Sequence, residues 1–182
     1  MYLLTEAYLG RLTFILLGIL ITFAAAAAEN LGNPELKAAI DRFNRNARIV
    51  TLEDLHESAQ AEFVGSSRPG IHPGFAAADF NGDKNIDYVV LLRVPGKKDL
   101  EGWLVVFLRE NKRRLRPVLL ETIIPLSDLV YIEVVPPEIA RETDSDRKAS
   151  FLYPGISRIY SEKSSTLFYW DKGRFRRIDT SD

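Results

Sequence analysis

Residues 79–92 read Asp79-Phe80-Asn81-Gly82-Asp83-Lys84-Asn85-Ile86-Asp87, followed by Tyr88-Val89-Val90-Leu91-Leu92, and the rest of the chain is organised around them. The apolar run predicts a buried central strand. Oxygen-bearing side chains occupy every second position before it: Asp79, Asn81, Asp83, Asn85 and Asp87. Because Ca²⁺ takes about 6 to 8 oxygen ligands, we expect these residues to form a Ca²⁺ site.

The loop differs from an EF-hand, whose loop has Gly at its sixth position and a bidentate Glu at its twelfth, between two helices. Counted from Asp79, these positions hold Lys84 and Val90, and the following segment is predicted to be a strand. The alternative to a metal site is a solvated turn, because Asp, Asn and Gly tolerate left-handed backbone and bond to their own backbone. Both interpretations place a tight turn in front of the central strand.

The spacing D-x-N-G-D-x-x-x-D before a strand resembles the calcium loop of FG-GAP and VCBS-type repeats, which occur in integrin-like propeller blades. The common pattern there is D-x-[DN]-G-D-G-x-x-D, and the chain matches it with Asp79, Asn81, Asp83 and Asp87. The resemblance covers residues 78–92 and implies a backbone carbonyl ligand at residue 85. The chain departs from the pattern at Lys84, where the family prefers Gly in a turn that needs positive φ. No repeat of the loop is visible, which argues against a propeller.

A wider resemblance adds the C-terminal part of the chain. The chain resembles a group of small exported bacterial proteins of unassigned function. They pair a G-D-F-N-G-D-G-x-x-D-Y-A-x-L-L-like segment with a late Y-W-x-x-G-x-F segment. The matching segments here are residues 78–92 and residues 169–175. This resemblance implies no activity.

The N-terminal segment 1–28 is typical of a secretory signal peptide. Arg11 precedes an apolar run at residues 12–23, and small residues follow up to Ala28. Cleavage there would leave residues 29–182 as a single domain with no stable membrane span, in the periplasm or secreted. The alternative is an uncleaved anchor, because residues 12–28 reach the short limit of a span.

Composition excludes several classes of function. The 182 residues contain no Cys, which excludes a disulfide scaffold and thiolate chemistry. A formal net charge of −1 provides no overall basic surface, so we expect no nucleic-acid partner. The chain has no G-x-S-x-G or H-E-x-x-H motif, and we expect both His56 and His72 to be structural.

The remaining pattern predicts an α+β fold, with two N-terminal helices packed on a largely antiparallel, meander-like β-sheet. Asn33 and Pro34 are typical of a helix start, and the apolar stripe of this helix runs to Ala47. Thr51 is expected to cap a second helix, which Gly65 would end.

The strands are expected to form a single sheet or half-barrel, because no helical pattern separates the first four of them. A tight turn is predicted at Asp171-Lys172-Gly173. The expected strands are residues 86–93, 103–108, 115–124, 129–135, 151–153, 156–160, 166–170 and 174–178.

These features favour an exported binding or interaction module with a structural calcium loop, whose partner is an unknown protein or a glycan in the cell envelope. Arg174, Arg176 and Arg177, together with basic residues in 97–98 and 112–116, could bind anionic glycans or lipid headgroups. The alternative for these charges is protection of a sheet edge. An inhibitor of an envelope enzyme stays open as a function, and a carboxylate-based hydrolase is less favoured.

Overall fold

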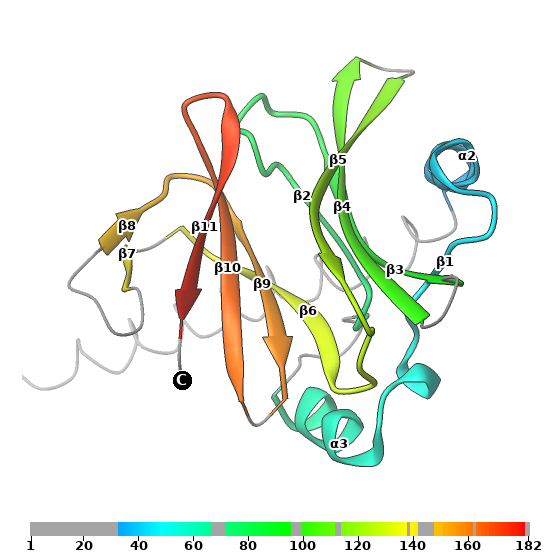
Figure 1. Ribbon diagram of the computed structural model, residues 1–182. Helices are drawn as coiled ribbons and strands as arrows, with labels where there is room; N and C mark the ends of the chain where they lie inside the picture. Colours follow the sequence, from blue (N-terminus) through cyan, green and yellow to red (C-terminus); the bar gives the residue numbers. More distant parts are fainter. Residues whose placement is uncertain are drawn as a thin grey trace, which may run out of the picture.

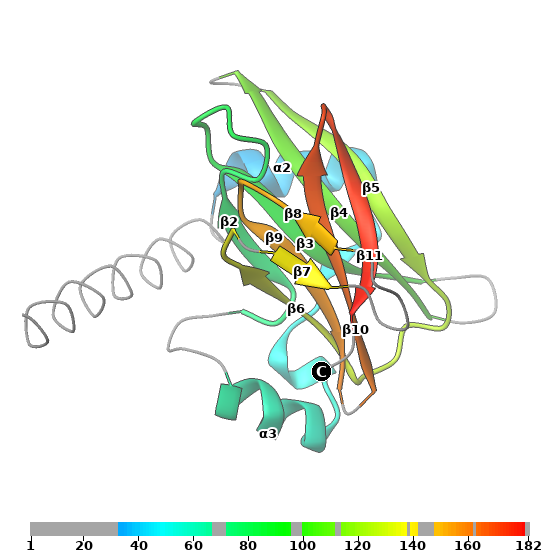
Figure 2. The ribbon, with the colours of Figure 1, turned by 90° about the vertical axis from the view of Figure 1, so that its left-hand side faces the viewer.

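A computed structural model describes residues 33–66, 72–95, 100–111, 114–137, 139–141, 148–161 and 163–180 (Figures 1 and 2). Two helices near the N-terminus precede two main antiparallel sheets, which confirms the predicted α+β class. The expectation of a single sheet is wrong. The predicted signal peptide at residues 1–28 lies outside the described residues. Within them, no helix has both the length and the apolar character that a membrane crossing requires.

The first sheet has five strands, and β3 lies between the others. Its order is β1 (Arg48–Ile49), β3 (Asp87–Pro95), β4 (Leu100–Asn111) and β5 (Arg114–Ile123), while β2 (Phe75–Ala78) also pairs with β3. Every pairing is antiparallel. As the apolar run predicts, β3 is buried on both faces, because the sheet is covered on both sides.

The second sheet has the order β11 (Arg174–Thr180), β10 (Ser164–Asp171), β9 (Gly155–Tyr160) and β6 (Val130–Val135). A separate hairpin joins β7 (Ile139–Arg141) to β8 (Lys148–Ser150). The predicted turn between β10 and β11 is confirmed. Lys172 and Gly173 have φ values of 49° and 83°, as a two-residue hairpin turn with positive φ at both positions requires.

Helix α2 (Pro34–Phe43) begins where the sequence predicts, because the Asn33 side chain accepts the Glu35 N–H at 2.8 Å. Its buried face, which includes Leu36 and Ile40, covers the outer face of the first sheet (Figure 1). The helix ends at Phe43 and does not reach Ala47.

The second predicted helix is divided in the structure. Thr51 forms a capping box with a 3₁₀ turn, η1 (Leu52–Asp54), and α3 (Glu57–Ser66) follows. The division occurs because Leu55 is extended, with ψ 147°, and because the Nδ1 of His56 accepts the Ser58 N–H at 3.3 Å. Gly65 lies inside α3 and does not terminate it.

The two sheets pack face to face, with α2 outside the first sheet and the β7–β8 hairpin outside the second (Figures 1 and 2). The core between the sheets includes Leu91 and Val106 from one sheet and Ile156 and Phe168 from the other. The sheets are joined on one side, where the Ile132 N–H of β6 donates to the Pro73 carbonyl at 2.8 Å.

Residues 151–153 were expected to form a strand, but they form a turn after β8. Phe151 is buried against Leu167 and Ile178 on the outer face of the second sheet. Tyr153 is directed to the loop that precedes β3, where its ring lies against Gly82. Tertiary contacts of the two aromatic rings therefore override the β-propensity of this segment.

Candidate cation loop and adjoining cleft

The acidic loop, residues 79–87, is folded around the carboxylate of Asp79. Its Oδ1 accepts the N–H groups of Gly82 at 2.7 Å and Asp83 at 3.1 Å. The Oδ2 accepts the N–H of Lys84 at 2.8 Å. Consecutive backbone N–H groups thus point at one anion, which holds the turn closed.

Two residues of the acidic loop have left-handed backbone. The φ angles are 78° for Gly82 and 68° for Lys84. Lys84 therefore has the positive φ for which the FG-GAP-like pattern uses Gly. The turn forms although Lys replaces Gly at this position. A side chain in this conformation costs about 1–2 kcal/mol.

The exposed part of the loop is stabilised by short local hydrogen bonds. The Oδ1 of Asn81 accepts the Asp83 N–H at 3.0 Å, and the Oδ1 of Asp83 accepts the Asn85 N–H at 2.8 Å. The amide of Asn81 also donates to Oδ2 of Asp83 at 3.1 Å. The side chains of Asp83 and Asn85 are exposed, so their remaining lone pairs face solvent.

Asp87 connects the loop to the first sheet and is 0% exposed. Its Oδ2 accepts the Phe80 N–H at 3.2 Å, and its Oδ1 accepts the Arg109 N–H of β4 at 2.8 Å. Burial raises the pKa of Asp87 to about 6; the two N–H bonds oppose the rise, and the negative charges of Asp83 and Asp79 add to it. The rise therefore reflects mainly the loss of water around the carboxyl group.

None of the loop carboxylates, Asp79, Asp83 and Asp87, is in an ion pair with a side chain of the described part of the chain. The donor set contains only oxygen, which suits a hard cation. Each carboxylate has about four lone-pair sites, and the N–H bonds use only part of them.

The loop carboxylates are nevertheless arranged around their own backbone. Over the described ranges, no group of three or more His, Cys, Asp or Glu side chains is placed to hold a metal ion. Calcium binding would therefore require the exposed side chains to turn toward a common centre. The assignment of Asp79, Asn81, Asp83, Asn85 and Asp87 as Ca²⁺ ligands stays a prediction.

A cleft of about 330 Å³ lies beside the acidic loop at one end of the sandwich. It is lined by Asn81 of the loop, by residues 150–153 and by residues 170–173 at the β10–β11 turn. Figure 1 shows the loop between β2 and β3 and the tip of the β10–β11 hairpin at this end. The two segments that carry the sequence resemblance, residues 78–92 and 169–175, therefore meet at one cleft.

Tyr153 lies between the acidic loop and the cleft. A Cβ added to Gly82 would lie 2.1 Å from ring carbons of Tyr153, so the ring packs directly on the loop backbone. Beside it, Leu152 is 78% exposed, and Trp170 packs edge-on against Phe175 with ring centroids 5.0 Å apart. The cleft thus has apolar and aromatic walls, and one of these walls depends on the loop.

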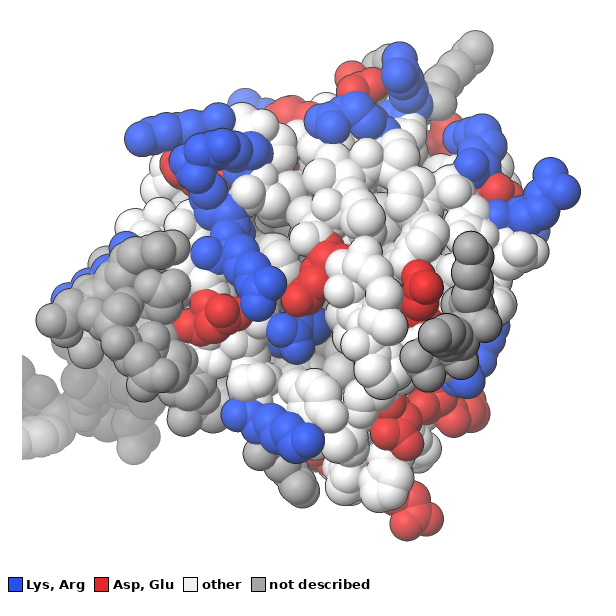
Figure 3. Space-filling model, in the orientation of Figure 1, with Lys and Arg blue, Asp and Glu red and all other residues white. Residues whose placement is uncertain are grey.

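Basic side chains gather over β11, and they extend from the hairpin tip along the strand (Figure 3). Arg176 contacts Asp171 at 3.5 Å, whereas the exposed Lys172 pairs with no acidic side chain of the described residues. On the other basic strand, Arg114 and Arg116 both pair with Glu110, as edge charges do. The predicted basic positions 97–98 and 112–113 lie outside the described residues.

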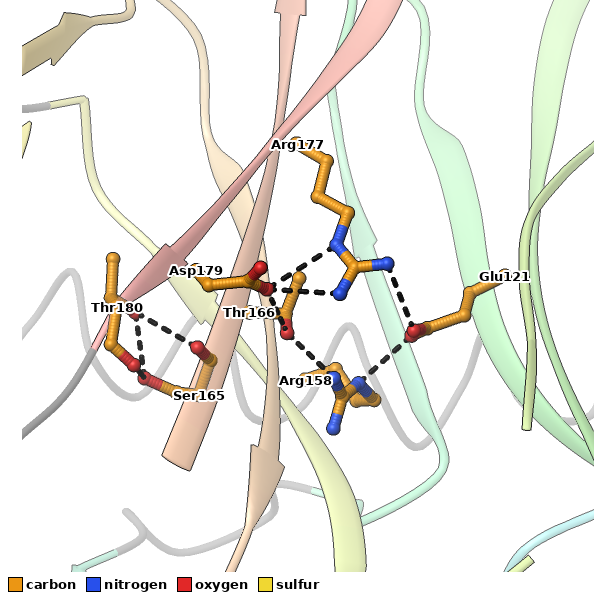
Figure 4. Close-up of polar contacts among 7 residues, drawn as sticks. All are labelled: Glu121, Arg158, Ser165, Thr166, Arg177, Asp179 and Thr180. Carbon is orange, nitrogen blue, oxygen red and sulfur yellow. Dashed lines mark hydrogen bonds and ion pairs between the residues drawn. The ribbon is translucent and has the colours of Figure 1, made fainter. Parts of the chain in front are cut away.

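A second polar cluster, the inter-sheet clamp, was not predicted from the sequence. It consists of Glu121 on β5, Arg158 on β9, Thr166 on β10, and Arg177 and Asp179 on β11 (Figure 4). Glu121 Oε2 lies 2.8 Å from Arg158 Nε, and its Oε1 lies 3.4 Å from Arg177 Nη1. The contact between Glu121 and Arg158 is an ion pair whose geometry does not meet the criteria for a hydrogen bond. The side chains of Glu121 and Arg158 are at most 16% exposed.

The remaining contacts of the clamp run across the second sheet. Arg158 donates to the Thr166 hydroxyl at 2.6 Å, and this hydroxyl donates to Asp179 at 2.9 Å. Burial alone would raise the pKa of Asp179, but hydrogen bonds from Arg177 and Thr166 lower it overall. The neighbouring hydroxyls of Ser165 and Thr180 lie 2.7 Å apart and strengthen the same pair of strands.

Other polar side chains have structural partners. His72 accepts the Gly74 N–H at 3.2 Å, and burial lowers its pKa. Glu62 of α3 accepts hydrogen bonds from Tyr131 and Ser161, which attaches the helix to the second sheet. Asp54 bonds to Arg48 and Arg93, and these bonds hold its pKa below the usual range. These clusters join elements of the fold and face neither the loop nor the cleft.

No family model, curated protein or solved structure matches this chain.

Proposed function

We propose that the protein is an exported binding module whose acidic loop takes up Ca²⁺ and thereby fixes one wall of the adjoining cleft. One observation carries this proposal. Carboxylates that have no cationic side-chain partner among the described residues form the loop on which Tyr153 packs. A bound cation would compensate their charge and hold the loop against the aromatic ring.

Part of the acidic loop is already ordered without a cation. Backbone N–H groups keep Asp79 and Asp87 in fixed positions, so only the exposed side chains have to be ordered by the ion. Lys84 is exposed and adds positive charge to the loop, which weakens cation binding. We therefore expect an affinity in the extracellular range, with a Kd of roughly 10⁻⁴ to 10⁻³ M.

Thermal unfolding with and without calcium tests the proposal. An ion that binds only the folded state adds about 1.4 to 2.7 kcal/mol at roughly 10 mM for these affinities, which is several degrees in Tm. Mg²⁺ should have a smaller effect, because it demands octahedral geometry and retains its waters. Equal melting in EDTA and in millimolar Ca²⁺ would show that the loop is only a turn.

Two matched variants assign the effect to the loop. Asp83→Ala removes an exposed loop carboxylate and should abolish the calcium-dependent shift. Asp128→Ala removes an exposed carboxylate from the turn before β6 and should retain it. Equal shifts for both variants would place the ion elsewhere.

Export is tested separately. The mature protein should begin near Glu29, which intact-mass measurement of the exported fraction will show. Recovery of the full chain from Met1 in the membrane fraction would contradict export with cleavage.

A further inference from the structure

The cleft combines aromatic surface with polar groups that have no partner among the described residues. Trp170 and Tyr153 both line it, and both are half-buried. Among the described residues, the indole N–H of Trp170 and the hydroxyl of Tyr153 form no hydrogen bond, and Lys172 forms no ion pair. Neither atom is among the buried polar atoms without a partner, so both reach solvent and can bond to a polar ligand that also offers an apolar face.

The two sides of the cleft differ in charge: the acidic loop lies on one side, and the β10–β11 hairpin, which carries basic residues, lies on the other. Lys172 belongs to the cleft lining, and Arg174 and Arg176 lie in the adjoining strand β11. Asp171, the acidic residue on this wall, is engaged by Arg176. A negatively charged group is therefore favoured on the hairpin side of the cleft.

The position of the cleft distinguishes between polar partners. The cleft lies where strands end in turns. The strand residues that line it are the short ends Ser150 of β8 and Trp170 and Asp171 of β10, which give an extended peptide little strand edge to add to. Its volume of about 330 Å³ is near the lower end for small-ligand sites, which span about 300 to 1,000 Å³. A ring-shaped ligand of one or two units fits these limits better than a polypeptide.

We propose that this cleft binds an acidic saccharide. A sugar ring has an apolar face for the aromatic walls and hydroxyl groups for the indole N–H and the phenol. Its carboxylate is placed beside Lys172. The proposal that the saccharide binds rests only on the residues of the cleft. Only its dependence on calcium rests on the proposed function, because the Tyr153 wall packs on the acidic loop.

Titration calorimetry of the mature chain with a short glucuronic acid oligomer tests this proposal, with the matching neutral glucose oligomer as comparison. Loss of a charge-assisted contact should weaken binding of the neutral oligomer by about tenfold or more. Equal affinity for both oligomers, or no binding of either, would overturn the proposal.

Substitutions locate the site. Lys172→Asn keeps a residue that tolerates positive φ and should weaken binding of the acidic oligomer by about tenfold. Lys163→Asn removes the same charge from the β9–β10 turn and should leave the affinity unchanged. Leu152→Ser, at an exposed position, should weaken binding without lowering Tm. An unchanged affinity for Lys172→Asn would place the saccharide elsewhere.

Repeating the titration in EDTA separates the two proposals. A calcium-dependent Tm shift without saccharide binding would overturn the cleft inference and leave the calcium loop intact. Saccharide binding that is equal in EDTA and calcium, with no Tm shift, would retain the cleft and reject the loop proposal. Binding to anionic phosphatidylglycerol vesicles, with no response to the saccharide, would identify a lipid headgroup as the ligand and overturn the inference.

Discussion

The acidic loop and the inter-sheet clamp both contain several carboxylates, but they compensate the negative charge in different ways. In the clamp, Glu121 and Asp179 contact the guanidinium groups of Arg158 and Arg177. In the loop, the hydrogen bonds to Asp79 and Asp87 from the described residues come from backbone N–H groups. Dipoles fix the position of a carboxylate and leave its charge available, whereas a guanidinium neutralises it. The difference is consistent with a structural role for the clamp and is the basis of our proposal that the loop takes up a cation.

The largest effect is expected from breaking the clamp. Glu121→Ala leaves Arg158, which is 12% exposed, without its counter-ion, and this should reduce the free energy of unfolding by about 3 kcal/mol. Glu110→Ala, which breaks exposed pairs with Arg114 and Arg116, should cost less than about 1 kcal/mol. Urea titration measures both changes. Equal losses in the free energy of unfolding would mean that the clamp stabilises the fold no more than an exposed ion pair does.

The next effect is a dependence on pH, which should have opposite sign in the two regions. The pKa of Asp87 is raised to about 6 in the folded protein. The folded state therefore binds this proton more tightly, and the contribution of Asp87 to stability is lost as pH rises from about 4 through 6. The loss amounts to at most about 3 kcal/mol in a calcium-free buffer.

Asp179 in the clamp should show the reverse. Its pKa is lowered, so its contribution is present above the ordinary pKa of an aspartate and is lost as pH falls below it. Urea titrations of wild type, Asp87→Asn and Asp179→Asn in EDTA, at pH values from below the ordinary pKa of an aspartate up to above 6, separate the two contributions. If Asp87→Asn leaves the pH dependence of wild type unchanged, Asp87 is not buried as described.

A smaller contrast is expected within the acidic loop itself. Asp79 accepts the N–H groups of Gly82, Asp83 and Lys84, so Asp79→Ala should cost about 1–2 kcal/mol in EDTA. Asp83 is exposed, and Asp83→Ala should cost no more than about 0.5 kcal/mol there. Thermal unfolding measures the difference. If both variants lose the same stability, Asp79 does not organise the turn.

The smallest effect is a gain. Lys84 has φ 68°, and Gly takes this conformation without steric strain, so Lys84→Gly should add about 0.5–1 kcal/mol to stability in EDTA. Lys148→Gly, in strand β8, should destabilise the protein, because Gly weakens a strand. A loss of stability in the Lys84 variant would show that its side chain contributes more than its strain costs.

Local signals were sufficient to predict several elements. The capping side chain of Asn33, the uninterrupted apolar run after Asp87 and the residues Lys172 and Gly173 each act within a few positions of the chain. The structure accordingly contains α2, the central strand β3 and the β10–β11 turn where they were expected. The acidic loop was located in the same way, as a tight turn before β3.

The misjudged features depend on distant partners. An apolar strand pattern does not reveal which strands pair, so one sheet was expected where the chain forms two. The predicted strand at 151–153 is a turn, because the Tyr153 ring packs on Gly82. The clamp joins Glu121 to Arg158 and Arg177 across both sheets. Charged residues at the inward positions of the strands, such as Glu121 on β5 and Arg158 on β9, were the signal that could have revealed it.

The contact between Gly82 and Tyr153 also bears on how this protein can change over generations. Position 82 requires positive φ, and the Tyr153 ring occupies the space that any side chain there would need. A substitution at Gly82 is therefore tolerated only if the aromatic ring at 153 is lost or displaced. Natural variation at the two positions should be coupled, and homologues that keep the ring should keep the glycine.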